Sequence, residues 1–251
     1  MRKHQFLLEE LVKRDFVKKY KRTILGMAWS VLSPLLMLLV MRLVFTRFFG
    51  RTMEHYTTFI FSGNLLFAYF RDSTTQGMAS LVGNASIFSK VNVPKYLFLF
   101  SKNIQALINF ALTMVVFLLF CIFDHVAITF HFIWLVYPIL CMMIFNIGIG
   151  FIVSALFVFF RDMEYLWSVF TQILMYFSAI FYQVDLYPIE IQRLFLLNPV
   201  YCYIKFFRII VLDGTLPSLQ FFLLCAAYAI VAFTIGGLVY KKNNTRFLYY
   251  I

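Results

Sequence analysis

The chain has 251 residues, of which 63% are hydrophobic and 13% are charged, and its mean hydropathy is +0.85. Soluble domains are roughly 45–50% apolar, so this composition excludes a soluble globular protein and predicts an integral membrane protein. The net charge of +11 would suggest a nucleic-acid partner in a soluble protein, but membrane proteins concentrate lysine and arginine in their cytoplasmic loops.

The opening segment, residues 1–22, is predicted to be an amphipathic helix that lies in the lipid headgroup layer. Its apolar side chains recur at every fourth position, at Leu8, Val12, Phe16, Tyr20 and Ile24, and are backed by Leu7 and Leu11. Lysines and arginines occupy the other side, which is typical of interfacial helices. A solvated basic arm is the alternative, but it does not explain why the apolar stripe continues into the next apolar run.

The remaining segment, 23–251, is predicted to be an all-α domain with six transmembrane helices. A spanning helix needs about 20 mostly apolar residues. The candidate spans are 23–41 with an extension to 46, 57–81, 103–123, 126–160 (a loop and a span), 165–184 and 215–240. Six spans place both ends of the chain on the same side of the membrane.

The basic residues indicate which side that is. Under the six-span arrangement, most lysines and arginines fall on one face, in the opening segment, the 82–102 connection and the tail. That face is expected to be cytoplasmic. The positive charge then reflects topology, and no nucleic-acid partner is expected.

The stretch from 185 to 214 differs from a simple membrane helix. Its apolar pieces are short and are interrupted by Pro188, Arg193, Pro199, Lys205 and Arg208. Irregular backbone at membrane depth is tolerated only where protein or a water-filled cavity satisfies its polar groups. The sequence therefore predicts an outer re-entrant region shaped around a transport pathway.

Two other features suggest a pathway. Arg71 and Asp72 interrupt the second span, and neighbours at i and i+1 do not face each other on a helix. One could face the translocation route while the other pairs with a neighbouring helix; alternatively, both lie near a membrane interface. Tyr176 and Tyr182, in the fifth span, belong either to an interfacial aromatic belt or to a glycan path lined by flat rings.

No catalytic or metal site is expected on this chain. It contains no Gly-Lys dipeptide, so it lacks a phosphate-binding Walker loop, and ATP-driven transport would need an ATPase on another polypeptide. The cluster of Asp124, His125 and His131 is compatible with a metal, but a hydrated loop explains it without one and is the preferred interpretation. Gly148 and Gly150 are expected to allow close helix packing, and the four cysteines to be buried, inert thiols.

Four stretches together resemble the membrane subunit of bacterial ABC exporters for polysaccharides, the group that moves O-antigen, capsular polysaccharide and teichoic acid. They are RDFVKKYKRTILGMAWSVLSPLLMLLV (14–40), LVGNASIFSKVNVPKY (81–96), FFRDMEYL (159–166) and the FY…P…LNP…FR run that ends at Gly214. Their order and spacing are more specific than any one motif. At the place of Arg71-Asp72 the family usually has small polar residues, so this chain departs from it there.

The resemblance implies a type 2 ABC exporter fold and a role for each matching segment. A coupling helix that docks into the ATPase would comprise Asn84, Ala85, Ser86, Ile87, Phe88 and Lys90, with Ile87 and Phe88 as apolar anchors. Cations beside the entry gate, suited to the diphosphate of a lipid carrier, would be Arg14, Lys18, Lys21 and Arg22. Arg71, Asp72, Tyr176 and Tyr182 are the candidate pathway residues.

The resemblance also implies the partners and the location. The chain would work as a homodimer in the bacterial cytoplasmic membrane, with two copies of a separate ATPase that holds ATP and Mg²⁺, and no cofactor on this chain. It would contact membrane lipids and move an undecaprenyl-diphosphate-linked polysaccharide. The alternatives are a drug or small-lipid exporter of the same fold, a membrane-embedded enzyme of envelope synthesis, and an assembly scaffold.

Overall fold

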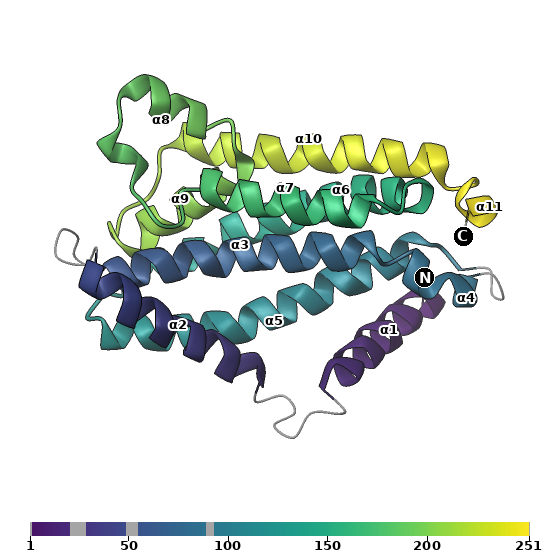
Figure 1. Cartoon of the computed structure of the whole chain (residues 1–251), viewed down its shortest axis with the longest axis horizontal. Helices are drawn as coiled ribbons and strands as arrows, with labels where there is room; N and C mark the ends of the chain where they lie inside the picture. Colours follow the sequence, from purple (N-terminus) through teal and green to yellow (C-terminus); the bar gives the residue numbers. More distant parts are fainter. Residues whose placement is uncertain (1, 21–28, 49–54, 89–92, 251) are drawn as a thin grey trace.

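The computed structural model describes residues 2–20, 29–48, 55–88 and 93–250, and in these residues the chain is helical without any strand. The helices are α1 (Arg2–Tyr20), α2 (Trp29–Phe48), α3 (Tyr56–Met78), η2 (Val82–Asn84), α4 (Ala85–Phe88), α5 (Tyr96–Phe123), η3 (Phe130–Leu135), α6 (Val136–Phe159), α7 (Met163–Phe177), η4 (Val184–Leu186), α8 (Ile189–Phe195), α9 (Pro199–Val211), α10 (Leu219–Asn243) and α11 (Phe247–Tyr250). The helices α3, α5, α6, α7 and α10 run roughly along the long axis of the molecule (Figure 1).

Helix α3 lies at the centre of this bundle. It packs against α2, α5, α6, α7 and α9. Its apolar side chains occur almost all round the helix, and Ile60, Leu66 and Phe70 are essentially inaccessible. A helix that is hydrophobic on all sides is stable only when neighbours cover it, which explains the central position.

Helices α6 and α10 approach each other closely, and glycines make this possible. A Cβ atom on Gly148 would collide with the backbone of Ala232, and one on Gly236 would collide with the backbone of Gly148. Gly150 lies beside Leu99 of α5, where a Cβ would be 3.2 Å from the leucine Cδ1. The structure therefore confirms that these glycines serve close helix packing.

The apolar lengths of the helices agree only in part with six spans. Among the described residues, α5, the continuous η3–α6 segment Phe130–Phe159 and α10 are long and apolar enough to cross a membrane. Helices α8 and α9 are bent by 108° relative to each other and would add a fourth if they form one broken span. The six-span arrangement stays a prediction.

Helix α7 is shorter than predicted. The apolar run 165–184 was expected to be one helix, but α7 ends at Phe177, so it has 15 residues. Ala179 then adopts the left-handed conformation with φ of 50°, and the chain turns back. At about 1.5 Å per residue, α7 is roughly 22 Å long, which is less than the ~30 Å hydrocarbon core of a bilayer.

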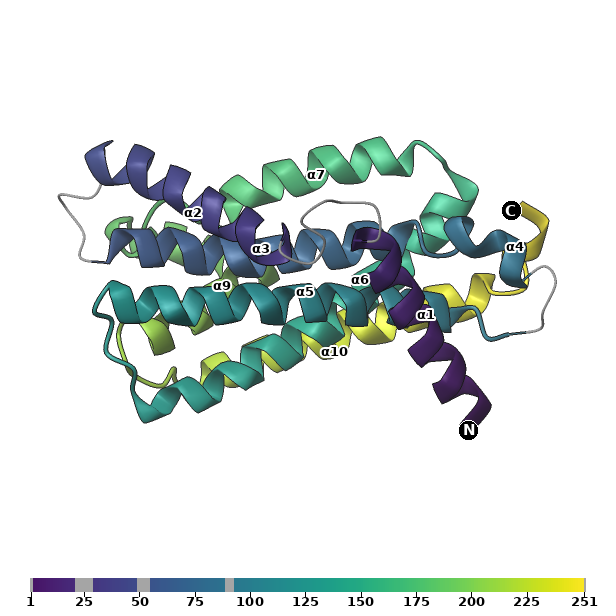
Figure 2. The ribbon, with the colours of Figure 1, turned by 90° about the horizontal axis from the view of Figure 1, so that it is seen from below.

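Helix α1 crosses the end of α5 obliquely instead of joining the parallel bundle (Figure 2). Leu11 is buried against Phe98 of α5, and Leu7 packs on the same cluster. The residues that back the predicted apolar stripe thus contact protein. Both α1 and α11 lie near α4, so the two ends of the chain are at the same end of the molecule (Figure 1).

Candidate functional site

The predicted coupling segment begins with a buried asparagine that contacts α1. Asn84 is 5% exposed, and its Nδ2 donates a hydrogen bond to the carbonyl oxygen of Ser80 at 2.8 Å. Its Oδ1 accepts a hydrogen bond from Arg14 Nη2 at 2.9 Å. A predicted gate cation and a predicted coupling residue are therefore bonded to each other directly.

Asp15 extends this contact to α5, and the sequence analysis missed it. One carboxylate oxygen accepts from Arg14 Nη2 at 2.8 Å, and the other lies 2.8 Å from Lys102 Nζ. The backbone oxygen of Asp15 accepts from Gln105 Nε2 at 3.0 Å. The Asp15 side chain is only 3% exposed, and a buried carboxylate is stable only when it is paired. The available signal was its place in the sequence, directly after Lys13-Arg14 and shortly before Lys18-Lys19.

The remaining predicted coupling and gate residues are only partly described by the structure. Ser86 is exposed, whereas Ala85 and Ile87 are partly buried against the Leu11–Phe98 cluster. The side chain of Ile87, expected to anchor the ATPase, is thus partly covered by other residues of this chain. Lys21, Arg22 and Lys90 lie outside the described residues, as do the side chains of Lys18 and Phe88.

Arg71 and Asp72 lie on an uninterrupted part of α3, with side chains 53% and 46% exposed. Arg71 Nε is 3.8 Å from Asp72 Oδ1. Neighbours at i and i+1 start from different sides of a helix, but the long arginine side chain folds back to within ion-pair distance of the Asp72 carboxylate. Arg71 begins 12 residues after Phe59, which places the pair about 18 Å further along α3 than Phe59.

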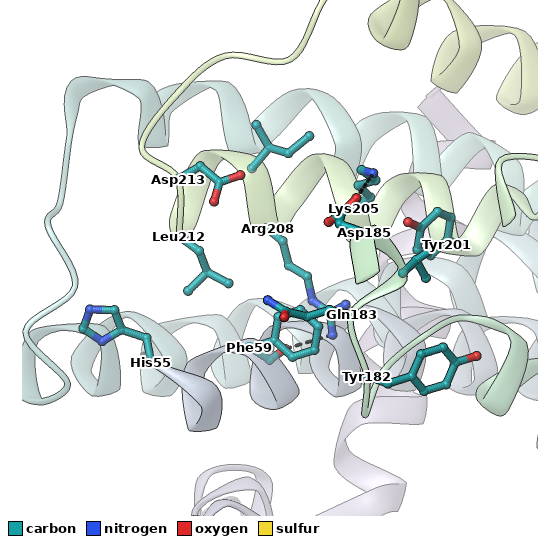
Figure 3. A pocket seen from close by; sticks show the side chains of 12 residues that line it. His55, Phe59, Tyr182, Gln183, Asp185, Tyr201, Lys205, Arg208, Leu212 and Asp213 are labelled. Atoms are coloured by element: carbon teal, nitrogen blue, oxygen red, sulfur yellow. Dashed lines mark hydrogen bonds and ion pairs between the residues drawn. The ribbon is translucent and has the colours of Figure 1, made fainter. Parts of the chain in front are cut away.

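That cavity has a volume of about 590 Å³ and lies between the start of α3, the η4 segment and α9 (Figure 3). The lining residues are His55, Phe59, Tyr182, Gln183, Val184, Asp185, Tyr201, Lys205, Arg208, Ile209, Leu212 and Asp213. Tyr182 is the predicted pathway residue that lines it, and its hydroxyl donates to the carbonyl oxygen of Tyr176 at 2.7 Å. The structure thus brings the two predicted tyrosines together.

Arg208 is the central cation of the cavity wall, and it joins three parts of the chain. It is 7% exposed. Its Nη1 donates to the carbonyl of Ala179 at 2.8 Å, and Nη2 donates to those of Phe59 and Ile180 at 2.9 and 3.0 Å. The guanidinium carbon lies 3.4 Å from the centroid of the Phe59 ring, a cation–π contact (Figure 3).

Local features of the sequence create the space for Arg208. A Cβ on Gly63 of α3 would be 2.5 Å from Arg208 Nη2, so a larger residue would force the guanidinium out of its present position. Positive φ at Ala179 turns the chain after α7, where the carbonyls of Ala179 and Ile180 accept from Arg208. The sequence analysis noted Arg208 only as an interruption of an apolar run.

Asn198 fixes the start of α9 and links it to α7. Its Oδ1 accepts from the backbone N–H of Val200 at 3.0 Å, and its Nδ2 donates to the carbonyl of Phe177 at 3.1 Å. Pro199 follows at the first helical position, where the missing N–H costs nothing. The Asn-Pro pair therefore holds the ends of α7 and α9 together.

Besides Arg208, the cavity is lined by one lysine, Lys205, and two carboxylates, Asp185 and Asp213. Lys205 Nζ is 2.9 Å from Asp185 Oδ1. Asp213 lies beyond the end of α9, where burial and then the Asp185 carboxylate raise its pKa, against a smaller opposing effect of Lys205. Among the described residues, no group of three or more histidine, cysteine, aspartate or glutamate side chains is placed to hold a metal ion. Asp124 instead contacts Thr58 and His55.

Comparison with known proteins places this arrangement in a family. The family model described as ABC-2 type transporter matches residues 7–212, which include both the Asp15 network and Arg208. The chain is 26% identical to an O-antigen export system permease protein RfbA of Klebsiella pneumoniae, over 96% of this chain and 93% of that protein. It is 24% identical to the protein of the same name in Myxococcus xanthus, over 96% and 94%.

A third relative is the capsule polysaccharide export inner-membrane protein CtrC of Neisseria meningitidis, 22% identical over 79% of this chain and 76% of that protein. The family match covers well over half of the chain. The chain therefore belongs to the ABC-2 type transporter family.

Proposed function

We propose that this chain is the permease subunit of an ATP-driven exporter that moves a lipid-linked polysaccharide across the bacterial cytoplasmic membrane. Its relatives are two O-antigen export permeases and a capsule polysaccharide export inner-membrane protein, and the similarity extends over most of the chain. In this proposal the carrier lipid is an undecaprenyl diphosphate, and the chain itself is not catalytic.

The working assembly is two copies of this chain with two copies of a separate ATPase. ATP and Mg²⁺ bind to the ATPase, in keeping with the lack of a Gly-Lys dipeptide in this chain. On α7, Ser168 and Gln172 are exposed one helical turn apart. Polar side chains in a span are costly in lipid, so this face of α7 is better suited to contact with a second copy of the chain or with an aqueous path.

The membrane arrangement in the proposal keeps six spans, namely α2, α3, α5, α6, α7 and α10. Helices α8 and α9 then form the outer re-entrant region, and both ends of the chain are cytoplasmic. The location of α1, α4 and α11 at one end of the molecule supports this orientation (Figure 1).

The observation that carries the coupling mechanism is the bonded path from α4 to α5. Asn84 precedes α4 and accepts from Arg14, and the neighbouring Asp15 pairs with Lys102 at 2.8 Å. A displacement of α4 by a bound ATPase would therefore move α1 and α5 with it. The movement of the ATPases when they close on ATP would thus be transmitted to the interfacial helix α1. The lipid diphosphate would enter beside this helix.

Co-purification with an ABC ATPase from the same genome tests the proposal. A stable complex whose ATP hydrolysis rises with lipid-linked glycan is the expected result. A complex that ignores glycans and responds to small amphiphiles would identify a drug or lipid exporter instead. Failure of the two proteins to associate would overturn the assignment of 84–90 as the coupling segment.

A further inference from the structure

We propose that the outer cavity binds a neutral sugar residue of the exported polymer, with Tyr182 as its platform and Asp213, Lys205 and Gln183 as its hydrogen-bonding partners. This inference rests on the proposed function and adds a defined contact site to it. The cavity volume of about 590 Å³ falls within the roughly 300–1,000 Å³ typical of small-molecule sites.

The charges of the lining favour a neutral ligand. Two cations, Lys205 and Arg208, are matched by two carboxylates, Asp185 and Asp213. A phosphate would meet no net positive charge there, whereas a polyhydroxyl ligand both donates and accepts hydrogen bonds and can use all four groups. Gln183 adds an amide that can act in either sense.

The aromatic side chains provide a fixed apolar surface. Phe59 is already covered by the Arg208 guanidinium, so the ring of Tyr182 is the better platform for the C–H face of a sugar. Phe195 and Tyr187 pack edge-on against Tyr182, with ring centroids 6.1 and 6.2 Å away. Its hydroxyl is bonded to the Tyr176 carbonyl, so the ring orientation is set before a ligand arrives.

Arg208 makes the site rigid and supplies one further donor. A guanidinium has five N–H groups. Four of them donate to Ser62, Ala179, Phe59 and Ile180, which leaves one on Nη1. Because Arg208 anchors α9 to α3 and to the turn after α7, the walls of the cavity are held together without a ligand.

The test uses the complete complex in nanodiscs and water-soluble oligosaccharides released by mild acid from the host's own surface polysaccharide. Saturation-transfer NMR should detect their binding to the wild type. Tyr182→Ala and Asp213→Asn should each weaken it at least tenfold. Phe130→Ala removes an aromatic side chain that is 80% exposed on η3, outside the cavity, and should leave binding unchanged.

Equal binding to the wild type and both cavity variants would overturn the proposal, as would the absence of any binding to a correctly folded wild type. Inorganic phosphate is the competing probe: if it displaces the oligosaccharides or binds alone at this site, the cavity is an anion site. Glycan-stimulated ATP hydrolysis is measured on the same samples. If that stimulation persists while the cavity variants bind normally, the exporter assignment stands and only the sugar site fails.

Discussion

Replacement of Arg208 by methionine should destabilise the protein more than any exposed arginine replacement. Methionine retains much of the apolar stem but donates no hydrogen bonds. The carbonyls of Ala179 and Ile180, which lie in a turn outside any helix, would lose their Arg208 donors, as would the Phe59 carbonyl. The residue is buried, so water cannot readily replace the guanidinium.

The size of the effect follows from the groups left behind. A buried acceptor without a partner costs about 1–3 kcal/mol. Two turn carbonyls give a loss of about 2–6 kcal/mol, and the gain from burying an apolar side chain offsets part of it, so we expect about 3 kcal/mol. For a chain of this length, each kcal/mol shifts Tm by about 2–4 °C, which corresponds to a drop of roughly 6–12 °C.

Thermal unfolding in detergent, followed by fluorescence-detected gel filtration, measures this shift. Arg193→Met on α8 is the matched control, since Arg193 is exposed, and its Tm should stay within about 2 °C of the wild type. If Arg208→Met unfolds at the same temperature as Arg193→Met, then Arg208 does not hold the three segments together.

Three further predictions concern the Asp15–Lys102 pair, the helix packing and the exposed charges. Asp15→Asn should lower the stability of the protein by about 2 kcal/mol, because Lys102 loses its partner, and should reduce glycan-stimulated ATP hydrolysis more than basal hydrolysis. The charge exchange Asp15→Lys with Lys102→Asp should restore part of the stimulation, and a lack of rescue would argue against the pair. Gly236→Ala should lower Tm, because the new Cβ meets the backbone of Gly148 at a cost of about 1–3 kcal/mol or more. The control is the adjacent Gly237→Ala, in which the new Cβ meets open space and which should be neutral or stabilise the protein by up to about 1 kcal/mol. Equal Tm values for the two variants would refute the close approach of α6 and α10. The double variant Arg71→Gln, Asp72→Asn should change the stability of the protein by less than about 1 kcal/mol, since both side chains are half exposed. It should reduce export while the complex still assembles. Normal export would show that these two residues are not part of the transport pathway.

Much of the architecture was predictable from local pattern. The apolar run 103–123 lies within α5, 126–160 corresponds to η3 with α6, and 215–240 overlaps α10. Helix α5 nevertheless begins earlier, at Tyr96, because Lys102 pairs with Asp15 and so is accommodated inside the helix. A sequence rule that starts or ends a span at a charged residue cannot anticipate that Lys102 has an ion-pair partner 87 residues away in Asp15.

The outer region shows the same limit. The Asn198-Pro199 pair predicted a break, and a helix does begin there. The end of α7 was missed because Ser178 to Val184 remain apolar enough to continue a helix, while the turn is set by Arg208 and Asn198 from a later segment. Contacts between distant parts of the chain decide these positions, and periodicity contains no information about them.

The candidate site divides in the same way. The sequence identified Arg14, Asn84, Tyr176 and Tyr182 individually, and the structure joins them as two bonded pairs. In the sequence, Asp15 differed only by its basic neighbours and Arg208 only by interrupting an apolar run; the burial that makes both residues important was not predictable. Burial of a charged residue depends on the packing of several helices and cannot be inferred from its immediate neighbours.

The central claim is that this chain forms the path for a lipid-linked polysaccharide, and transport in proteoliposomes tests it most directly. The purified complex of this chain with its ATPase would be reconstituted with glycan on a labelled carrier lipid, and the glycan that reaches the opposite leaflet would be measured with an impermeant glycosidase. The account predicts transfer that requires ATP and stops when the ATPase is inactivated. A folded, ATP-hydrolysing complex that leaves the glycan in its original leaflet would contradict it.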